Sequence, residues 1–223
     1  MQHLTFDILY SIFSKARMQP YLKNNDDAKL VLSRYHDNIM LSEAMIPTLH
    51  YFEICLRNRI DYILKKHFSP TWLLHLPNHL MISEQDKKKI EDIISKTRRV
   101  NKREPHHDDV VAQMTFGFWC AFFHRKYDPV IWHRKDTIKT VFPNLLRHNR
   151  KRMYVEDKIL ILKEIRNRIA HHEPVWNRKI SILDAHTVAH ELIFAMSSEA
   201  TSLLKTIDRF PSIYEKLTKK INQ

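Results

Sequence analysis

Glycine is almost missing from this chain, because Gly117 is the only one among 223 residues. Phosphate-binding loops, dinucleotide-binding turns and tight β-hairpins each need glycine at defined positions, since other residues adopt those backbone angles only with strain. Folds of the P-loop and Rossmann types are therefore excluded. A chain this poor in glycine and rich in Leu, Ile, Lys and Arg is typical of an all-α protein.

Cysteine and long apolar runs are scarce as well. Cys55 and Cys120 both lie within apolar stretches and are too few for a disulfide scaffold, so we expect buried, reduced thiols. Neither has a partner at the spacing of a zinc site. The N-terminus lacks a signal-peptide pattern, and no apolar run reaches the length of a membrane span. We therefore expect a cytoplasmic protein that does not enter the membrane.

What the chain does have is apolar bulk and positive charge. Hydrophobic residues make up 43% of it, which is enough for the core of a single helical domain over residues 1–223. The 37 Lys and Arg outnumber the 25 Asp and Glu, so the formal net charge is +12. Such an excess attracts polyanions, of which nucleic acid is the commonest. Many proteins carry a similar excess for solubility alone, so charge supports nucleic-acid binding without proving it.

Apolar residues recur at helical spacing along most of the chain. The predicted helices cover residues 4–18, 28–46, 49–63, 83–97, 110–123, 155–172 and 181–205, with a short helix after Pro211. Pro47 is compatible with a kink or with the first turn of a new helix. Residues 96–109 (KTRRVNKREPHHDD) are so polar that they predict a long loop or hinge. Together these patterns predict one bundle of roughly seven to nine helices.

The segment IRNRIAHHEPVW at residues 165–176 brings reactive side chains to the end of a helix. Asn167 and His171 are four residues apart and share the polar side of the helix, opposite its isoleucines. Arg166 is roughly 140° from His171 on an ideal helix, although its long side chain can still approach the histidine. His172 falls on the apolar side and is the more structural of the two. The alternative is a basic helix terminus whose histidines complement the helix dipole.

The spacing of arginine and histidine is not specific by itself. An arginine followed by a histidine after four to six intervening residues also occurs at Arg99 and His106, within the charged segment of a chain with 15 histidines. The copy at Arg166 differs because it belongs to an apolar helix and continues into the stiff sequence EPVW at residues 173–176. A functional site needs such a rigid support.

Residues 166–176 (RNRIAHHEPVW) resemble the signature of the Abi-like (AbiD/AbiF) abortive-infection proteins, part of the HEPN superfamily, which is marked by an Arg–polar–spacer–His pattern. The segments YFEICLRNRI at 51–60 and MTFGFW at 114–119 extend the resemblance over most of the chain. The resemblance implies an all-α, HEPN-type helical bundle with additional helices. It also implies a homodimer acting as a metal-independent endoribonuclease without a cofactor, with a composite site at the dimer interface.

The same resemblance assigns catalysis to Arg166, Asn167 and His171, with His172 as a second candidate because both histidines match the loose spacing. Some HEPN proteins bind RNA or nucleotides without cutting them, so a non-catalytic RNA-binding or antitoxin-binding module is the alternative. The expected role is an RNA-targeting toxin in phage defence, through abortive infection or a toxin–antitoxin pair. The expected partners are RNA, a second copy of the chain, and an antitoxin protein or small RNA.

These residue types suit RNA cleavage without a metal. A 2′-hydroxyl attacks the adjacent phosphate, which leaves a 2′,3′-cyclic phosphate end and needs no metal-activated water. A histidine can take or return the proton, and Arg166 can stabilise the charge that develops on the phosphate. Asn167 can orient the histidine or bind the phosphate. DNA lacks the 2′-hydroxyl, so this chemistry predicts cleavage of RNA only.

Basic residues elsewhere are candidate RNA contacts. The set comprises Arg57, Arg147, Arg150, Lys151, Arg152 and Arg168. A solvated surface explains the basic run 147–152 equally well. The tetrad RNRI at 57–60 repeats the one at Arg166, as a structural echo or a secondary RNA contact. The aromatic row between Phe116 and Phe123 favours a core over a base-stacking platform.

Two histidine groups are candidate metal ligands. His186 and His190 are four residues apart, with Asp184 and Glu191 nearby, but the segment is not a His-Glu-x-x-His motif. The residues HHDD at 106–109 are better suited to capping the helix that follows. We assign no metal from the sequence.

Overall fold

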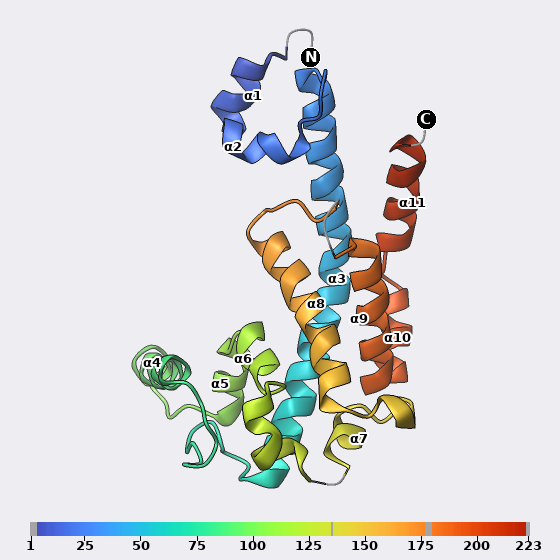
Figure 1. Cartoon of the computed structure of the whole chain (residues 1–223). Helices are drawn as coiled ribbons and strands as arrows, with labels where there is room; N and C mark the ends of the chain where they lie inside the picture. The colour runs from blue at the N-terminus through green and yellow to red at the C-terminus, as the bar shows by residue number, and fades with distance from the viewer. Residues whose placement is uncertain (1–3, 135, 177–179, 222–223) are drawn as a thin grey trace.

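The computed structural model describes residues 4–134, 136–176 and 180–221, and within these ranges every regular element is a helix. The all-α prediction is confirmed. A 40-residue helix, α3 (Ala28–His67), runs through the whole molecule (Figure 1). Two short helices, α1 (Phe6–Phe13) and α2 (Lys15–Met18), lie at its N-terminal end.

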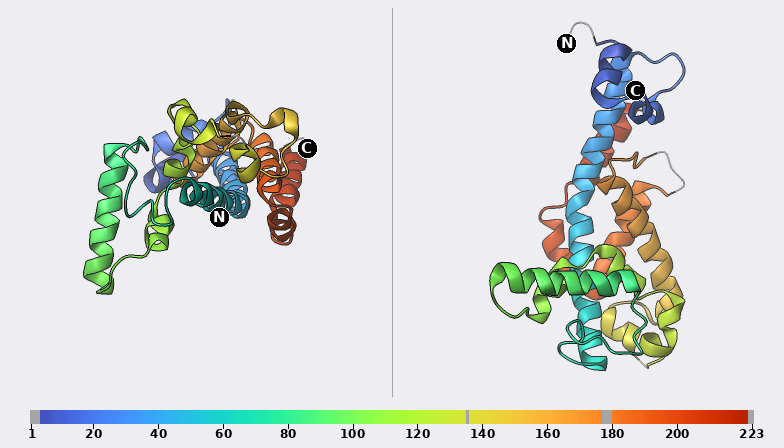
Figure 2. Two further views of the ribbon diagram at one scale, coloured as in Figure 1. Left: turned by 90° about the horizontal axis from the view of Figure 1, so that it is seen from below. Right: turned by 90° about the vertical axis from the view of Figure 1, so that its left-hand side faces the viewer.

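The other elements pack along α3 or across it. They are α4 (Glu84–Asn101), α5 (His107–Gln113), α6 (Phe116–Ala121), α7 (Thr137–Val141), α8 (Arg152–Ala170), α9 (Ile182–Met196), α10 (Ser198–Lys205) and α11 (Phe210–Ile221), with 3-10 segments at Gln19–Tyr21, Arg125–Tyr127 and Arg147–Asn149 and a π-helical turn at Asp128–Trp132. Helices α8 and α9 lie alongside α3, whereas α4 runs across the direction of α3 (Figure 2). None of the helices among the described residues has both the length and the apolar character to cross a membrane.

Helix α3 replaces two predicted helices. It begins where the Asp27 carboxylate accepts the amide hydrogen of Leu30 at 2.7 Å, and it continues through Pro47 to His67. Proline donates no amide hydrogen and therefore weakens the preceding turn. Buried residues such as Met45 and Leu49 flank Pro47 on the core side, and this packing favours one continuous helix.

The predicted loop at 96–109 is wrong over most of its length. Helix α4 continues to Asn101 and ends at Lys102, which has a left-handed backbone (φ 49°), and α5 begins at His107. Thr97 is buried in line with earlier isoleucines of α4, so the charged residues of 96–101 form the exposed side of a helix. Only residues 102–106 are outside a helix, and the Arg103–Asp109 ion pair (2.7 Å) spans them.

Three other predicted helices are each divided by an internal cap. Within the predicted helix 4–18, the Ser14 hydroxyl accepts from the Arg17 amide at 3.3 Å and separates α1 from α2. The Thr115 hydroxyl accepts from the Phe118 amide at 3.4 Å and separates α5 from α6, and the Ser197 hydroxyl accepts from the Ala200 amide at 3.0 Å between α9 and α10. The described residues consequently form eleven α-helices, more than the predicted number, because hydroxyl caps interrupt apolar runs that looked continuous.

Aromatic side chains fill the core where α3, α6 and the segment around Trp72 meet. Trp72 and Trp119 are fully buried, and so are the phenylalanines Phe52, Phe122 and Phe123. The aromatic row is therefore part of the core and not a base-stacking surface. Both cysteines are free thiols, as expected; Cys120 is buried and Cys55 is partly buried. Burial raises the pKa of the Cys120 thiol.

Candidate functional site

The reactive segment begins where α8 ends, and a specific backbone arrangement stops the helix there. His172 adopts a left-handed conformation (φ 57°), and its amide donates to the carbonyl of Ile169 at 3.1 Å. The Glu173 amide donates to the carbonyl of Arg168 at 2.8 Å. These two bonds form a Schellman motif, in which glycine is the usual left-handed residue. A histidine holds that position here, and His171 caps the helix just before it.

Asn38 of α3 holds the chain that follows this cap. Its side-chain oxygen accepts from the Val175 amide at 2.8 Å, and its side-chain nitrogen donates to the carbonyl of Glu173 at 3.4 Å. The residue between them, Pro174, is buried, and Asn38 itself is only 3% exposed. The stiff EPVW segment is thus fastened to the longest helix of the molecule by one buried amide.

Arg17 of α2 binds the same helix end. Its guanidinium Nη1 donates to the carbonyl oxygens of His172 at 2.7 Å and His171 at 3.4 Å. The last carbonyls of a helix lack intrahelical partners and carry partial negative charge, so a cation there is stabilising. The backbone of the two histidines is therefore held by residues more than a hundred positions earlier in the chain.

The four predicted catalytic side chains differ in their surroundings. The imidazoles of His171 and His172 are exposed, whereas Arg166 and Asn167 are half-buried. The Arg166 guanidinium carbon is 6.0 Å from the centre of the Phe116 ring, within the range of a cation–π contact. Over the described part of the chain, no hydrogen bond or ion pair involves the side chain of Arg166. No carboxylate of the described residues therefore pairs with its positive charge.

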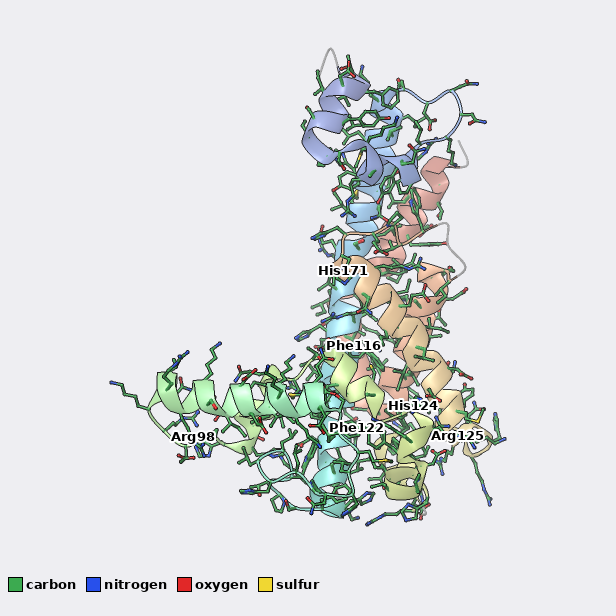
Figure 3. All side chains as sticks on the ribbon, turned by 60° about the vertical axis from the view of Figure 1, so that its left-hand side comes forward. Arg98, Phe116, Phe122, His124, Arg125 and His171 are labelled. Carbon is green, nitrogen blue, oxygen red and sulfur yellow. The ribbon has the colours of Figure 1, made fainter. Side chains whose placement is uncertain are left out.

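Arg166 and His171 do not meet within one copy of the chain. Figure 3 shows His171 at the end of α8 and Phe116, the ring beside Arg166, farther along where α6 packs against α8. Among the residues that the structure describes, no hydrogen bond or cation–π contact joins the Arg166 and His171 side chains. Both groups are available to a common ligand, but neither fixes the other.

Three of the predicted RNA contacts already bind protein groups. Arg168 forms an ion pair with Glu164 one turn earlier. Arg150 donates to the carbonyls of Leu145 at 2.8 Å and Pro143 at 3.2 Å.

Arg152 is the most enclosed of the three. Its side chain is 9% exposed and forms ion pairs with Asp128, at 2.5 Å, and with Glu156. Its position assigns it a structural role, which the sequence did not indicate.

The remaining predicted RNA contacts are more open. Arg147 and Lys151 are exposed at the two sides of the turn before α8. Arg57 is half-buried on α3, where its Nε donates to the side-chain oxygen of Asn58 at 3.2 Å. The RNRI repeat at 57–60 also includes Arg59, whose guanidinium donates to the carbonyl of Met196 at 2.5 Å. That second arginine fastens α3 to the end of α9.

The structure also shows the contacts of the two histidine groups that were candidate metal ligands. In the HHDD segment, Asp109 accepts from the His106 amide at 2.7 Å, so it caps α5 as expected. His107 is buried against Asp61, with 2.7 Å between Nε2 and the carboxylate.

His186 and His190 meet neither of the acidic residues nearest to them in sequence. Both contact Asp208, while Glu191 holds Tyr154 and Lys158.

Sequence reasoning missed Asn38, Arg17 and Asp208. Each acts on a partner that is distant in sequence, up to 155 residues for Arg17 and His172. The only local signal was at Asn38, a polar side chain on the apolar side of a long helix.

The fold and this helix end define a class of protein, an all-α bundle with a basic helix terminus. That terminus carries exposed histidines, and its Arg166 has no carboxylate partner in the described part of the chain. A family model described as Abi-like protein matches residues 8–177, and the chain belongs to this family. Membership supports a role in abortive infection, a defence against phage. Comparisons with curated proteins and with solved structures find no match.

Proposed function

We propose that this protein is a metal-independent endoribonuclease of the HEPN type, acting as an RNA-targeting toxin in phage defence. The observation that carries the proposal is Arg166, a half-buried guanidinium that no carboxylate of the described residues pairs with, on the same helix as the exposed His171. An arginine that is not neutralised by a neighbour suits the binding of a phosphate. The rigid backbone beyond it suits a group that must be positioned for reaction.

The proposed reaction is an internal transfer at one phosphate. His171 takes the proton of the 2′-hydroxyl, and the freed oxygen forms a bond to phosphorus. The bond from phosphorus to the 5′-oxygen breaks, and a protonated histidine returns a proton to that leaving oxygen. Arg166 stabilises the charge on the phosphate oxygens during the transfer, and Asn167 positions the histidine or the phosphate.

His171 is the better candidate for the base. It follows Asn167 by four residues and lies on the same side of α8, and its amide donates to the Asn167 carbonyl at 2.9 Å. His172 instead occupies the left-handed position of the cap, outside the helical row that Asn167 and His171 share. In this proposal His172 shapes the helix end, and RNA binding extends to Arg147 and Lys151 on the exposed turn before α8.

The test compares cleavage by wild type, Arg166→Gln and His171→Ala on a panel of RNAs, in buffer with a metal chelator. Arg99→Gln is the matched control, because Arg99 is an exposed arginine on α4 that a histidine, His106, follows within the same loose range of spacing. Wild type and Arg99→Gln should give 2′,3′-cyclic phosphate ends on RNA and none on DNA. Removing one charge-stabilising donor should lower the rate by about 10²–10³-fold in Arg166→Gln.

Two results would contradict the enzyme. One is equal cleavage by Arg166→Gln and Arg99→Gln. The other is RNA binding without cleavage by dimeric wild-type protein across the whole panel, which would favour the alternative, a non-catalytic RNA-binding or antitoxin-binding module. In that case the affinity should still fall steeply with salt, because phosphate contacts release counterions.

A further inference from the structure

A compact group of metal-ligating side chains lies far from the end of α8. His186 and His190 extend from successive turns of α9, and Asp208 lies in the short connection between α10 and α11. The Nε2 atom of His186 is 2.9 Å from Asp208 Oδ2, and the Nε2 atom of His190 is 2.8 Å from the same oxygen. All three ligand atoms lie within 4.8 Å of one another. Three potential ligands therefore converge on one point.

Further contacts fix two of the three groups in this orientation. The other oxygen of Asp208, Oδ1, accepts from the Phe210 amide at 3.0 Å, which leaves Oδ2 directed at the imidazoles. The Phe210 ring stacks on the His186 ring, with 4.4 Å between centroids and 16° between planes. Metal sites depend on such outer contacts, which hold each ligand in its coordinating orientation.

The charge balance of this group differs from that of the other histidine–carboxylate group. Asp61, which contacts His107, also accepts from the indole of Trp72 and pairs with Lys65 at 2.8 Å, so a permanent cation already compensates it. Among the described residues, no lysine or arginine contacts Asp208. A carboxylate with a side chain only 5% exposed requires a compensating positive charge.

We propose that His186, His190 and Asp208 form a binding site for a divalent transition-metal ion of the zinc class. Two imidazole nitrogens and one carboxylate oxygen are ligands that zinc accepts. Tetrahedral coordination at about 2.0–2.1 Å sets ligand atoms roughly 3.3 Å apart, so the present contacts need to open by only about half an ångström. The His190 side chain is 20% exposed, which leaves a path for the ion and for a water as fourth ligand.

The bound ion would fasten the connection before α11 to α9. This site is distinct from the end of α8 in both position and chemistry. It also lies outside residues 8–177, the range matched by the family model. The proposal is independent of the ribonuclease proposal, since ion binding is measured without RNA and the proposed cleavage requires no metal.

The experiment titrates chelator-treated, full-length protein with Zn²⁺ by calorimetry and with Co²⁺ by visible absorption. The variants are His190→Gln and Asp208→Asn, and Asp108→Asn is the matched control. Asp108 belongs to the other histidine–carboxylate group, and its side chain is 85% exposed, so its loss should not disturb the fold. Circular dichroism verifies that each variant is folded.

Wild type and Asp108→Asn should bind one Zn²⁺ per chain, and Co²⁺ should give the intense visible bands of a tetrahedral site. Affinity should fall at least 10-fold in His190→Gln and in Asp208→Asn, and the melting temperature should rise with Zn²⁺ only where the site is intact. Absence of one-to-one binding in wild type would overturn the proposal, and so would unchanged affinity in either ligand variant. If a ligand variant does not fold, the Co²⁺ spectrum of wild type tests the proposal instead. A spectrum typical of octahedral Co²⁺, or the absence of visible bands, would exclude the site.

Discussion

Asn38→Ala should destabilise the protein more than any other single change to an asparagine on α3. The substitution leaves the amide of Val175, a residue that is 0% exposed, without the acceptor now 2.8 Å away. An unsatisfied buried donor costs about 1–3 kcal/mol. The second bond, to the carbonyl of Glu173, is long at 3.4 Å and its acceptor residue is exposed, so water can replace much of it. We expect a loss of about 2–3 kcal/mol in the free energy of unfolding.

The measurement is urea unfolding followed by circular dichroism, with Asn58→Ala as the control. Asn58 is on the same helix, but its side chain is exposed and accepts only from Arg57. The control should change stability by less than about 0.5 kcal/mol. In thermal melts, Asn38→Ala should lower the midpoint by about 4–12 °C for a domain of this size. If the two variants are equally stable, then Asn38 does not hold the segment after α8, and the rigidity inferred for it is wrong.

Three further outcomes follow from the same structure. His172→Gly should raise the free energy of unfolding by about 0.5–1 kcal/mol, because glycine adopts the left-handed cap without strain. A lower urea midpoint would contradict this prediction. RNA cleavage should persist in this variant. Arg152→Met should cost about 1–3 kcal/mol by leaving two partly exposed carboxylates unpaired, whereas Lys151→Met should change stability by less than about 0.5 kcal/mol while weakening RNA binding. The hydrogen bonds from Arg103 lower the pKa of Asp109 to about 2, so the stabilisation by the ionised carboxylate should be complete above pH 4 or so and vanish as the pH falls towards about 2. Urea midpoints of wild type and Asp109→Asn should therefore converge at low pH, and a constant gap would refute the assignment.

The sequence predicted helices well where one side is consistently apolar. Helix α8 was expected over 155–172 and extends from Arg152 to Ala170, because its buried residues recur at regular helical intervals. The errors arose where a local signal competed with tertiary packing. Thr115 caps a helix inside an apolar run, and the 96–101 stretch is helical because Thr97 packs inward beneath its charged neighbours. Polar composition alone cannot separate a loop from the exposed side of a helix.

The candidate site was predictable only in its local part. The four-residue interval placed Asn167 and His171 on one side of α8 without any structure. The role of Asn38 could not be predicted from the sequence, because its hydrogen bond to Val175 joins positions 137 residues apart. Asp208 is separated from His190 by an entire helix, α10, and Glu191, the acidic residue next to His190 in sequence, contacts Lys158 instead. Long-range contacts of this kind depend on the fold as a whole.

The separation of Arg166 from His171 also bears on how the proposed active site is completed. Arg166 lies beside Phe116 of α6, and His171 is at the exposed end of α8. If the protein is a homodimer, as we propose, each residue can serve a phosphate that contacts both copies of the chain. If each site combines Arg166 of one chain with His171 of the other, then a mixture of Arg166→Gln and His171→Ala chains regains activity. Half of the dimers are then mixed and each has one intact site of two, so about a quarter of wild-type activity is expected. If both residues act within one chain, no dimer has an intact site and the mixture stays inactive. Complementation therefore distinguishes a composite site from a self-contained one, provided that each variant alone is inactive and dimeric.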